Sequence, residues 1–543
     1  MRIGVDVGGT NTDAVLMEGR EVLAWTKQPT TADVNAGVVA AIGAVLDQAG
    51  AQPCGIDAVM IGTTHFTNAL VQRQAIDSVG ILRLASPSGE ALPPLTGWPA
   101  ELVDSVGRNI FLLPGGYEVD GREISPFDED KVAAAARSLR DQGIDCVAIS
   151  CAFAPINAAM EERAADVVRR EHPAAAISLS SRIGRIGFIE RENAAILNAA
   201  LTSLAGKVVS SFERALVDLG IAAPLYISQN DGTLISAAQA AAYPVLTIGS
   251  GPTNSMRGAA FLAGIGDAIV MDVGGTTTDI GVLAGGFPRE SSISVDIGGV
   301  RTNFRMPDIL AIGLGGGTRI HLDPALHGAE EIPADALRVG PDSVAFRIVE
   351  DGLLFGGRTL TASDIAVAAG DAAFGDASLL PAFSPTMVST VRGRFRAMLE
   401  EGVDRIKTTR GDVTVLAVGG GSFLIPDGLK GVAAVIRPDH AAVANAVGAA
   451  IGQVGAQVER IVDYDSLPRD EALDQLRGEA ANRVVAAGGD AKTVQLVEVD
   501  EVFLSYLPGR AAQVRVRAVG DLAGTKATIV PADAAREVAH HAH

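Results

Sequence analysis

The sequence predicts an α/β fold built from two duplicated halves. One octapeptide occurs twice, Ala-rich periodic segments alternate with short Val, Ile and Leu runs, and 543 residues are too many for one core. Aromatic residues make up only 4% of the chain, so we expect the core to be aliphatic.

The repeated octapeptide carries most of this prediction. Residues 6–13 read DVGGTNTD and residues 272–279 read DVGGTTTD, so seven of eight positions agree at an offset of 266 residues. Short apolar runs precede and follow each copy. The pattern predicts a β-hairpin in each half, with a turn that needs positive φ at its glycines.

We expect a first domain over residues 1–190, a second over residues 191–464, and a small α/β appendage over residues 465–543. Periodicity predicts helices over residues 32–49, 131–142, 161–171, 191–219 (as a pair) and 471–487. It predicts further strands over residues 58–61, 146–152, 225–229, 245–248, 413–418, 493–506 and 512–519. The small-residue segment 444–450 predicts a helix that packs closely on another segment and hinges the halves.

Charge and composition exclude some classes of protein. The net charge is −20 and no stretch clusters Lys and Arg, which argues against a nucleic-acid-binding protein. No apolar run reaches about 20 residues, so no membrane span is expected. Sparse cysteines and an N-terminus that begins at once with a strand pattern favour the cytoplasm. The histidines at 540, 541 and 543 are interpreted as a solvated tail, and not as a metal site.

The two octapeptides predict a clamp for a polyphosphate. Glycine turns direct backbone N–H groups into one concavity, and Thr hydroxyls add donors. The predicted phosphate-binding residues are Gly8, Gly9, Thr10, Asn11 and Thr12 in one copy and Gly274, Gly275, Thr276 and Thr277 in the other. Asp6 and Asp272 repel phosphate, so we expect them to act through Mg²⁺ or water. The alternative is that each copy is only a tight hairpin with an Asp-capped turn.

A third glycine turn follows the strand predicted over residues 413–418. Gly419, Gly420 and Gly421 allow close approach of a flat ligand, and we expect them to contact adenosine before a helix begins. An ordinary strand–turn–helix connection explains this turn equally well when it is considered alone. His65, just after a predicted strand, is a candidate for placing substrate or transferring a proton, with a structural histidine as the alternative.

These motifs, in this order, resemble the actin/sugar-kinase/Hsp70 superfamily, and more narrowly the hydantoinase A/oxoprolinase family. The resemblance covers residues 1–460. It rests on segments 3–13 (IGVDVGGTNTD), 62–70 (GTTHFTNAL), 191–194 (RENA), 250–252 (SGP) and 271–279 (MDVGGTTTD). It implies two ribonuclease-H-like domains around a cleft that binds ATP and Mg²⁺. The chain is shorter than typical family members, and residues 253–255 (TNS) depart from the small residues found there in many members.

The family resemblance also implies a reaction. Members open cyclic amides such as hydantoins, 5-oxoproline or lactams by phosphorylating the carbonyl oxygen with ATP, often with a second, hydantoinase B-like chain. On this basis Asp6 and Asp272 are expected to hold the metal, while Asp13, Asp279 and His65 place the acceptor. An oligomer is expected. The alternatives are a subunit of an acetone- or acetophenone-type carboxylase, a small-molecule kinase, and a nucleotide-switched binding or filament protein.

Overall fold

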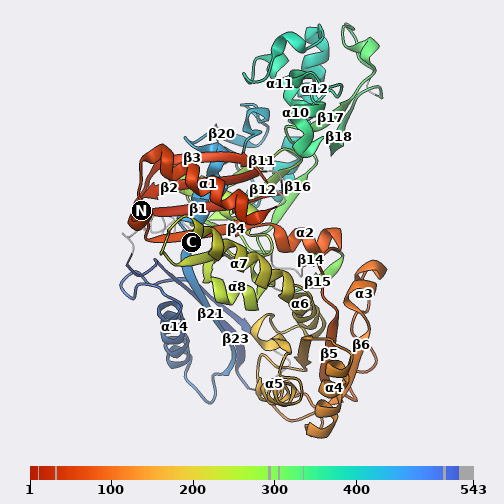
Figure 1. The fold of residues 1–543 in the computed structure, drawn as a ribbon, viewed down its shortest axis with the longest axis vertical. Coiled ribbons are helices and arrows are strands. Elements are labelled where there is room, and N and C mark those ends of the chain that lie inside the picture. The colour runs from red at the N-terminus through yellow and green to blue at the C-terminus, as the bar shows by residue number, and fades with distance from the viewer. Residues whose placement is uncertain are drawn as a thin grey trace.

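The computed structural model describes residues 1–9, 11–30, 33–291, 295–303, 306–333, 335–504 and 509–524. Thr10 and the C-terminal histidines lie outside the described residues. Figure 1 shows the chain as an elongated molecule, with the two main sheets in the middle and smaller subdomains toward the ends.

The first main sheet has the first octapeptide at its centre. β1 (Arg2–Val7), β2 (Asn11–Glu18) and β3 (Glu21–Pro29) form an antiparallel meander. β4 (Ala58–Thr63) and β9 (Leu225–Ser228) extend the sheet in parallel from β1, giving the order β3-β2-β1-β4-β9. β1 and β4 are apolar runs because both faces of this sheet are buried.

The second main sheet repeats this topology. β11 (Ala268–Val273), β12 (Thr278–Ala284) and β13 (Phe287–Pro288) are antiparallel, and β19 (Val413–Val418) and β20 (Val432–Ile436) continue in parallel. The order β13-β12-β11-β19-β20 matches that of the first sheet. β16 (Ile309–Ile312) additionally pairs with β12. The repeat in sequence is therefore a repeat in fold, and the two ribonuclease-H-like units are confirmed.

Two helices join the halves. α9 (Ser250–Ala263) contacts β11 and β4, and α13 (Ala444–Ala450) contacts α9 and β1. A side chain at Gly258 would collide with the backbone carbonyl of Ala444, and one at Gly448 would collide with that of Asn254. The absence of Cβ atoms lets the two helices touch backbone to backbone. The close packing predicted for residues 444–450 is confirmed.

Strand pairing extends the first unit beyond the expected domain boundary. α6 (Phe188–Ala200), α7 (Thr202–Asp218) and β9 all precede the crossing to the second sheet, which occurs at α9. The sheet of the first unit therefore extends past the expected boundary at residue 190. The reason is that β9 completes the first unit by pairing in parallel with β4, although it is distant in sequence.

The C-terminal segment is not a separate appendage. β21 (Gln453–Asp463) pairs in parallel with β10 (Thr233–Ser236), which itself pairs with β9, so the first sheet continues into it. β23 (Ala511–Gly520) and β22 (Gln495–Phe503) complete a nine-stranded sheet, and α14 (Arg469–Ala486) packs on β21 and β23. Figure 1 shows these blue elements below the first domain.

Each half carries an inserted subdomain. In the first half, β5 (Val79–Ser86), β6 (Asn109–Pro114), β7 (Cys146–Cys151) and β8 (Ala176–Leu179) form a parallel sheet in the order β6-β5-β7-β8. It packs with α3 (Ala100–Val106), α4 (Glu129–Asp141) and α5 (Ala159–Glu171). In the second half the hairpin β17 (Thr318–His321) and β18 (Arg338–Ser343) precedes α10 (Ile348–Asp351), α11 (Ala362–Ala369) and α12 (Pro385–Ile406). The insertions lie at opposite ends of Figure 1.

Most predicted helices are present with small shifts in their bounds. α1 (Val34–Ala49) begins after Asp33, whose carboxylate caps two backbone N–H groups, and ends at Gly50 with φ of 61°. Residues 244–247 form a 3-10 helix instead of the predicted strand, because Pro244 fixes its first residue. Among the described residues no single helix is long and apolar enough to cross a membrane, and α6 with α7, bent by 55°, meets that test only as a pair.

Candidate functional site

The turns of the two octapeptides are closed by equivalent backbone hydrogen bonds. The amide of Gly8 donates to the Asn11 carbonyl at 3.0 Å, and the amide of Gly274 donates to the Thr277 carbonyl at 2.9 Å. The predicted hairpins are therefore confirmed. The predicted positive φ is wrong, because neither glycine of either turn has a positive φ. A Cβ at Gly275 would meet no atom within 4 Å, so the second turn borders open space.

Paired carboxylates stand at the base of the first turn. Asp6 and Asp13 are direct cross-strand partners, and both are buried. Lys27 on β3 contacts both oxygens of Asp13, at 2.7 and 2.6 Å. The side-chain amide of Asn445 on α13 donates to Asp6 at 2.9 Å and to Asp13 at 2.8 Å. One ammonium and one amide thus hold two acids together.

Asp6 has fewer hydrogen-bond and ion-pair partners than Asp13. Burial and the nearby charge of Asp13 raise the pKa of Asp6 to about 7, despite the hydrogen bond from Asn445. Its Oδ1 atom has no hydrogen-bond partner. The side-chain nitrogen of Asn254 on α9 is also without a partner, and a Cβ at Gly62 would lie 2.6 Å from each of these two atoms. A hydrogen-bond donor and a hydrogen-bond acceptor, each without a partner, thus lie close to the same small region beside Gly62.

The second turn carries an equivalent pair of aspartates. Among the described residues, no lysine hydrogen-bonds to this pair as Lys27 does to Asp13. Asp272 and Asp279 are cross-strand partners. Burial and then Asp272 raise the pKa of Asp279 to about 7. Burial raises the pKa of Asp272 as well, and the charge of Lys27 opposes this effect. Because Lys27 and Asp13 act on Asp272, and Asp272 acts on Asp6, the acidic ends of the two hairpins face each other.

These acids fit a hydrated divalent cation. The described residues contain no group of three or more His, Cys, Asp or Glu side chains at ligand spacing. Mg²⁺ binds through one or two carboxylates and keeps several waters. The unpartnered Oδ1 of Asp6 and the raised pKa of Asp6 and Asp279 match a region that a cation would neutralise.

The third glycine turn packs against the second. Gly419 has φ of 84°, and a side chain there would collide with the carboxylate of Asp272. The amide of Gly421 donates to the Val273 carbonyl at 2.8 Å, while a Cβ at Gly420 would meet nothing within 4 Å. The turn therefore fixes Asp272 on one side and borders open space on the other. A 3-10 turn over Ser422–Leu424 follows it, in place of the predicted helix.

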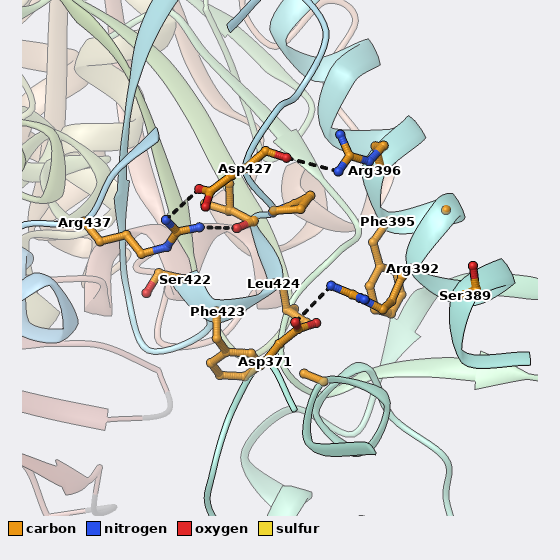
Figure 2. A pocket seen from close by; sticks show the side chains of 14 residues that line it. Asp371, Ser389, Arg392, Phe395, Arg396, Ser422, Phe423, Leu424, Asp427 and Arg437 are labelled. Carbon is orange, nitrogen blue, oxygen red and sulfur yellow. Dashed lines mark hydrogen bonds and ion pairs between the residues drawn. The ribbon is translucent and has the colours of Figure 1, made fainter. Parts of the chain in front are cut away.

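A cavity of about 690 Å³ begins directly after this turn (Figure 2). Its walls combine apolar side chains with arginines from α12 and the segment before α13. The lining includes Ser389, Arg392, Gly393, Phe395, Arg396, Ser422, Phe423, Leu424 and Arg437. Arg392 donates to Asp371 at 2.9 Å, and Arg437 donates to Asp427 at 3.0 Å, so both guanidinium groups are held in place. The space suits a planar polar ligand continuing from the glycine turn.

His65 lies at the start of α2 (His65–Gln72), beside the first turn. Its Nδ1 is 2.6 Å from the Thr63 hydroxyl, and burial lowers the pKa of His65, which favours the neutral ring. Residues on both sides of His65 reach the turn, since the amide of Thr64 donates to the Val7 carbonyl and the side-chain nitrogen of Asn68 lies 3.7 Å from the Cβ position of Gly9. The segment that carries His65 is therefore placed at the first turn.

Other sequence candidates separate into those near the turns and those elsewhere. Thr12 lies on the opposite face of β2 from Asp13, because strand side chains alternate, and its hydroxyl is 3.3 Å from that of Thr30. Residues 313–317 brace the second turn, where Gly316 and Gly317 donate to its carbonyls. Residues 191–193 hold the inserted sheet, and Glu192 forms a buried ion pair with Arg83.

Sequence reasoning missed Lys27 and Asn445 as site residues. Lys27 had a usable signal, because in a β2–β3 hairpin it falls directly opposite Asp13. Asn445 is the single polar side chain in the small-residue segment 444–450, and that contrast was the available signal. Its partners are 439 and 432 residues away, so no local pattern identifies them.

Duplicated ribonuclease-H-like units whose glycine hairpins present facing carboxylates define this chain as a member of the actin/sugar-kinase/Hsp70 class of fold. A family model described as Hydantoinase/oxoprolinase N-terminal region matches residues 2–172, and one described as Hydantoinase/oxoprolinase matches residues 191–373. Together they span more than half of the chain. The chain belongs to the hydantoinase/oxoprolinase family.

Two curated relatives illustrate the similarity. Caprolactamase subunit alpha of Pseudomonas jessenii is 28% identical over 451 residues, which cover 74% of this chain and 63% of the relative. Acetophenone carboxylase gamma subunit of Aromatoleum aromaticum is 27% identical over 376 residues, covering 63% and 49%. This chain thus spans between half and two thirds of the length of these relatives.

Two solved structures share the fold. The ATP-dependent caprolactamase from Pseudomonas jessenii has a TM-score of 0.77 at 21% identity, covering 97% of this chain and 88% of that one. A nucleotide-free acetone carboxylase structure has a TM-score of 0.67 at 18% identity, covering 96% and 88%. At these identities the likeness establishes the fold.

Proposed function

We propose that this chain is the ATP-using subunit of an amidohydrolase, and that it phosphorylates the carbonyl oxygen of a cyclic amide such as a hydantoin, 5-oxoproline or a lactam. The observation that carries the proposal is the facing pair of hairpins, each with two cross-strand aspartates behind an open glycine turn. Family membership supports it, since curated relatives include Caprolactamase subunit alpha and 5-oxoprolinase 1.

In this proposal ATP lies across all three glycine turns. Residues 9–11 and 275–277 donate backbone N–H groups to the phosphates, while the amides of Gly8 and Gly274 close the two turns. Asn11 with Thr276 and Thr277 add side-chain donors. Adenosine follows Gly419, Gly420 and Gly421 toward the cavity of Figure 2. The cavity begins at Ser422, next to the turn, which is the placement that a base and ribose need.

Asp6 and Asp272 are the proposed metal-holding residues, acting through water. Bound Mg²⁺ supplies positive charge against the phosphates as the phosphoryl group moves. Asn445 and Lys27 keep Asp6 and Asp13 at a fixed separation, so the acids are pre-positioned before nucleotide binds.

The acceptor is proposed to lie between His65 and the two outer aspartates, Asp13 and Asp279. Phosphorylating an amide oxygen requires loss of the amide N–H proton. Asp279, whose pKa is raised to about 7, is suited to take that proton near neutral pH. His65 in its neutral form can orient the amide by hydrogen bonding, and Asp13 is held by Lys27.

A second chain is part of the proposal. The relatives named above are themselves subunits, and the described residues contain no cluster of three or more His, Cys, Asp or Glu that could hold a hydrolytic metal. A hydantoinase B-like partner in the cytoplasm, forming a hetero-oligomer, is therefore the expected setting in which water attacks the phosphorylated carbon.

The test is a screen for ADP release by the purified chain with Mg²⁺, against hydantoin, 5-oxoproline and caprolactam, with and without a co-purified partner. The proposal expects at least one cyclic amide to stimulate ADP release, while its open-chain amide analogue does not. Stimulation by none of them, with ATP bound, would contradict it.

A carboxylase subunit is the second candidate, favoured by the similarity to the gamma subunit of acetophenone carboxylase and the beta subunit of acetone carboxylase. The same phosphoryl transfer to a carbonyl-derived oxygen would then act on a ketone enol. Bicarbonate together with acetone or acetophenone should stimulate ADP release in that case, and cyclic amides should not.

A further inference from the structure

A second cavity, of about 640 Å³, lies on the first domain and shares no lining residue with the three glycine turns. Its walls come from the inserted sheet, from the hairpin between β9 and β10, and from β21 with its neighbours α14 and β23. The lining includes Ile156, Arg182, Arg185, Asn230, Asp231, Gln457, Glu459, Arg460, Arg483 and Arg517. Five arginines and two acids line the cavity, and each arginine is also within ion-pair distance of an acid outside the lining: Glu162, Glu290 or Glu479.

The position of the cavity is typical of ligand sites in parallel sheets. Pro155 and Ile156 follow β7, and residues 181–185 follow β8, so two loops at the carboxyl ends of parallel strands form one wall. Open α/β sheets bind ligands at this edge, because the loops converge there and the helix N-termini point toward it. The opposing wall, β21, is part of the nine-stranded main sheet.

Arg517 on β23 offers an unfilled donor edge in this cavity. Its side chain is 5% exposed, and its Nη1 donates to Glu290 at 2.7 Å. The Nε and Nη2 atoms have no hydrogen-bond partner, and the nearest acid, Asp231, is 4.0 Å from Nε. Nε and Nη2 are the side-by-side pair with which a guanidinium binds both oxygens of a carboxylate. The Phe287 ring, 5.2 Å from the guanidinium carbon, limits its movement.

Asn230 supplies a second unfilled donor. This residue is 3% exposed, it lines the same cavity, and its Nδ2 has no partner. Its backbone is fixed, because its amide donates to Leu246 and its carbonyl accepts from the Thr253 hydroxyl. Buried donors without acceptors are costly, so two of them lining one cavity indicate a missing acceptor.

The acids in the wall do not fill this need. Asp231 accepts from the amide and hydroxyl of Thr233, and Glu459 accepts from Gln457 and Gln513. Arg257, buried behind the β9–β10 hairpin, adds positive charge, and burial with the neighbouring Arg517 lowers the pKa of Arg257 to about 10. The Nε and Nη2 atoms of Arg517 and the Nδ2 atom of Asn230 therefore remain without an acceptor among the described residues.

The geometry points to a binding site for a small organic carboxylate in this cavity, with Arg517 as the bidentate donor and Asn230 as the second donor. A planar carboxylate matches the guanidinium edge better than a tetrahedral anion does. The site is tied to the nucleotide region, because Thr253, which bonds to Asn230, precedes Asn254, and Asn254 converges with Asp6 on Gly62. The inference does not depend on the proposed function.

Calorimetric titration of the full chain with acetate, glutarate and 6-aminohexanoate, at constant ionic strength, tests the site, with inorganic phosphate as the tetrahedral comparison. One saturable carboxylate site is expected. Arg517→Gln and, separately, the isosteric Asn230→Asp should each weaken binding about tenfold or more, since each removes a hydrogen bond to a charged group. Arg477→Gln changes an exposed arginine on α14 that does not line the cavity, and it should leave binding unchanged.

The outcomes separate the sources of the ligand. Binding of acetate or glutarate identifies a site for free carboxylates, whereas binding of 6-aminohexanoate alone identifies a site for ring-opened amide products, and either supports the inference. No saturable carboxylate binding by the wild-type chain would overturn it. Phosphate binding as tight as carboxylate binding would also overturn it, and so would undiminished carboxylate binding in a folded Asn230→Asp variant. The Asn230→Asp variant keeps the inference testable if Arg517→Gln does not fold.

Discussion

Asn445 donates its side-chain amide hydrogen to Asp6 at 2.9 Å, although 439 residues separate them. The same nitrogen lies 2.8 Å from Asp13, so a residue near the end of the second half bridges the two acids of the first. The bridge is made by α13, which returns from the second sheet to pack on β1. One side-chain amide from the second half therefore helps to place both acids of the first half.

Asn445→Ala should remove the donor shared by Asp6 and Asp13. The two carboxylates then repel each other without a bridging group, and we expect the free energy of unfolding to fall by about 1–3 kcal/mol. The apparent affinity for Mg²⁺ in ATP turnover should also change, because the acids lose their fixed separation. Urea denaturation and Mg²⁺ titrations of ATPase activity measure these effects.

Asn35→Ala is the matched control for this change. Asn35 donates to Asp218 at 3.2 Å on the exposed side of α1, far from the turns. Its loss should leave the Mg²⁺ dependence unaltered. If the two variants shift the Mg²⁺ dependence equally, the bridging role of Asn445 is wrong.

Asp6→Asn should change the pH dependence of stability. The pKa of Asp6 is raised to about 7 in the ligand-free fold, from an ordinary value near 3.8, so the folded state holds a proton that the unfolded state has lost. Stability from this group is therefore full below about pH 4, falls as pH rises toward 7, and is constant above. The variant carries no such charge, so its stability relative to wild type should rise between pH 5 and pH 7 by on the order of 2 kcal/mol.

The measurement is urea denaturation of both proteins without nucleotide or metal, from about pH 5 to about pH 8.5. A difference in unfolding free energy that is constant over this range contradicts the assigned ionisation of Asp6. Adding Mg²⁺ should stabilise the wild type more than the variant at pH 8, because only the wild type offers a carboxylate there.

The sequence repeat predicted the central hairpins because a glycine turn between short apolar runs has few alternative structures. In the structure Asp6 pairs with Asp13 and Asp272 with Asp279 across these two hairpins. The partners of these acids could not be predicted in the same way. Asn445 reaches Asp6 only through tertiary packing of α13, and the single clue in sequence was one polar residue in an apolar helix.

The strands that the first sheet gains from beyond residue 190 could not be predicted for a related reason. A parallel strand needs a crossover, so β9 and β21 join the first sheet after long excursions that no local pattern records. The expected positive φ at the repeated glycines was wrong because a four-residue turn does not require it there. At Gly275 the glycine leaves open space, and that property appears only once neighbouring segments are in place.

Gly275→Val should abolish ATP binding without unfolding the chain. A Cβ at this position meets no atom within 4 Å, so the fold tolerates the side chain, which then occupies the space assigned to phosphate. Fluorescent-nucleotide titration measures the loss. Gly411→Val is the matched control, because Gly411 lies in an exposed loop with equally open surroundings. The Gly411→Val variant should bind ATP as the wild type does. Wild-type affinity in Gly275→Val would rule out the phosphate clamp.

Asp272→Ala should lower ATP turnover about 100-fold or more, because the metal that Asp272 is proposed to hold offsets charge on the transferring phosphoryl group. Asp412→Ala, at an exposed position before β19, serves as the control and should keep full activity. Steady-state ADP release at saturating substrate is the measurement. Turnover within about threefold of wild type, a barrier change below about 0.7 kcal/mol, would remove Asp272 from the mechanism.

The route of phosphoryl transfer can be followed with an amide substrate labelled with oxygen-18 at its carbonyl. In the proposed reaction the carbonyl oxygen attacks the γ-phosphorus, the bond to the β–γ bridging oxygen breaks, and ADP leaves, while Asp279 takes the amide proton. Water then adds to the activated carbon, and the ring C–N bond breaks as its nitrogen takes up a proton, which leaves an acyl phosphate. A second water attacks the same carbon, and cleavage of the carbon–oxygen bond releases phosphate that carries the label. Mass spectrometry of released phosphate, with the partner chain present, should therefore find one labelled oxygen for each ring opened. Unlabelled substrate in oxygen-18 water is the reciprocal control and should label the carboxylate product only. Label retained wholly in the carboxylate product, with ATP consumed in equal amount, would contradict this route and favour one in which ATP drives a conformational step.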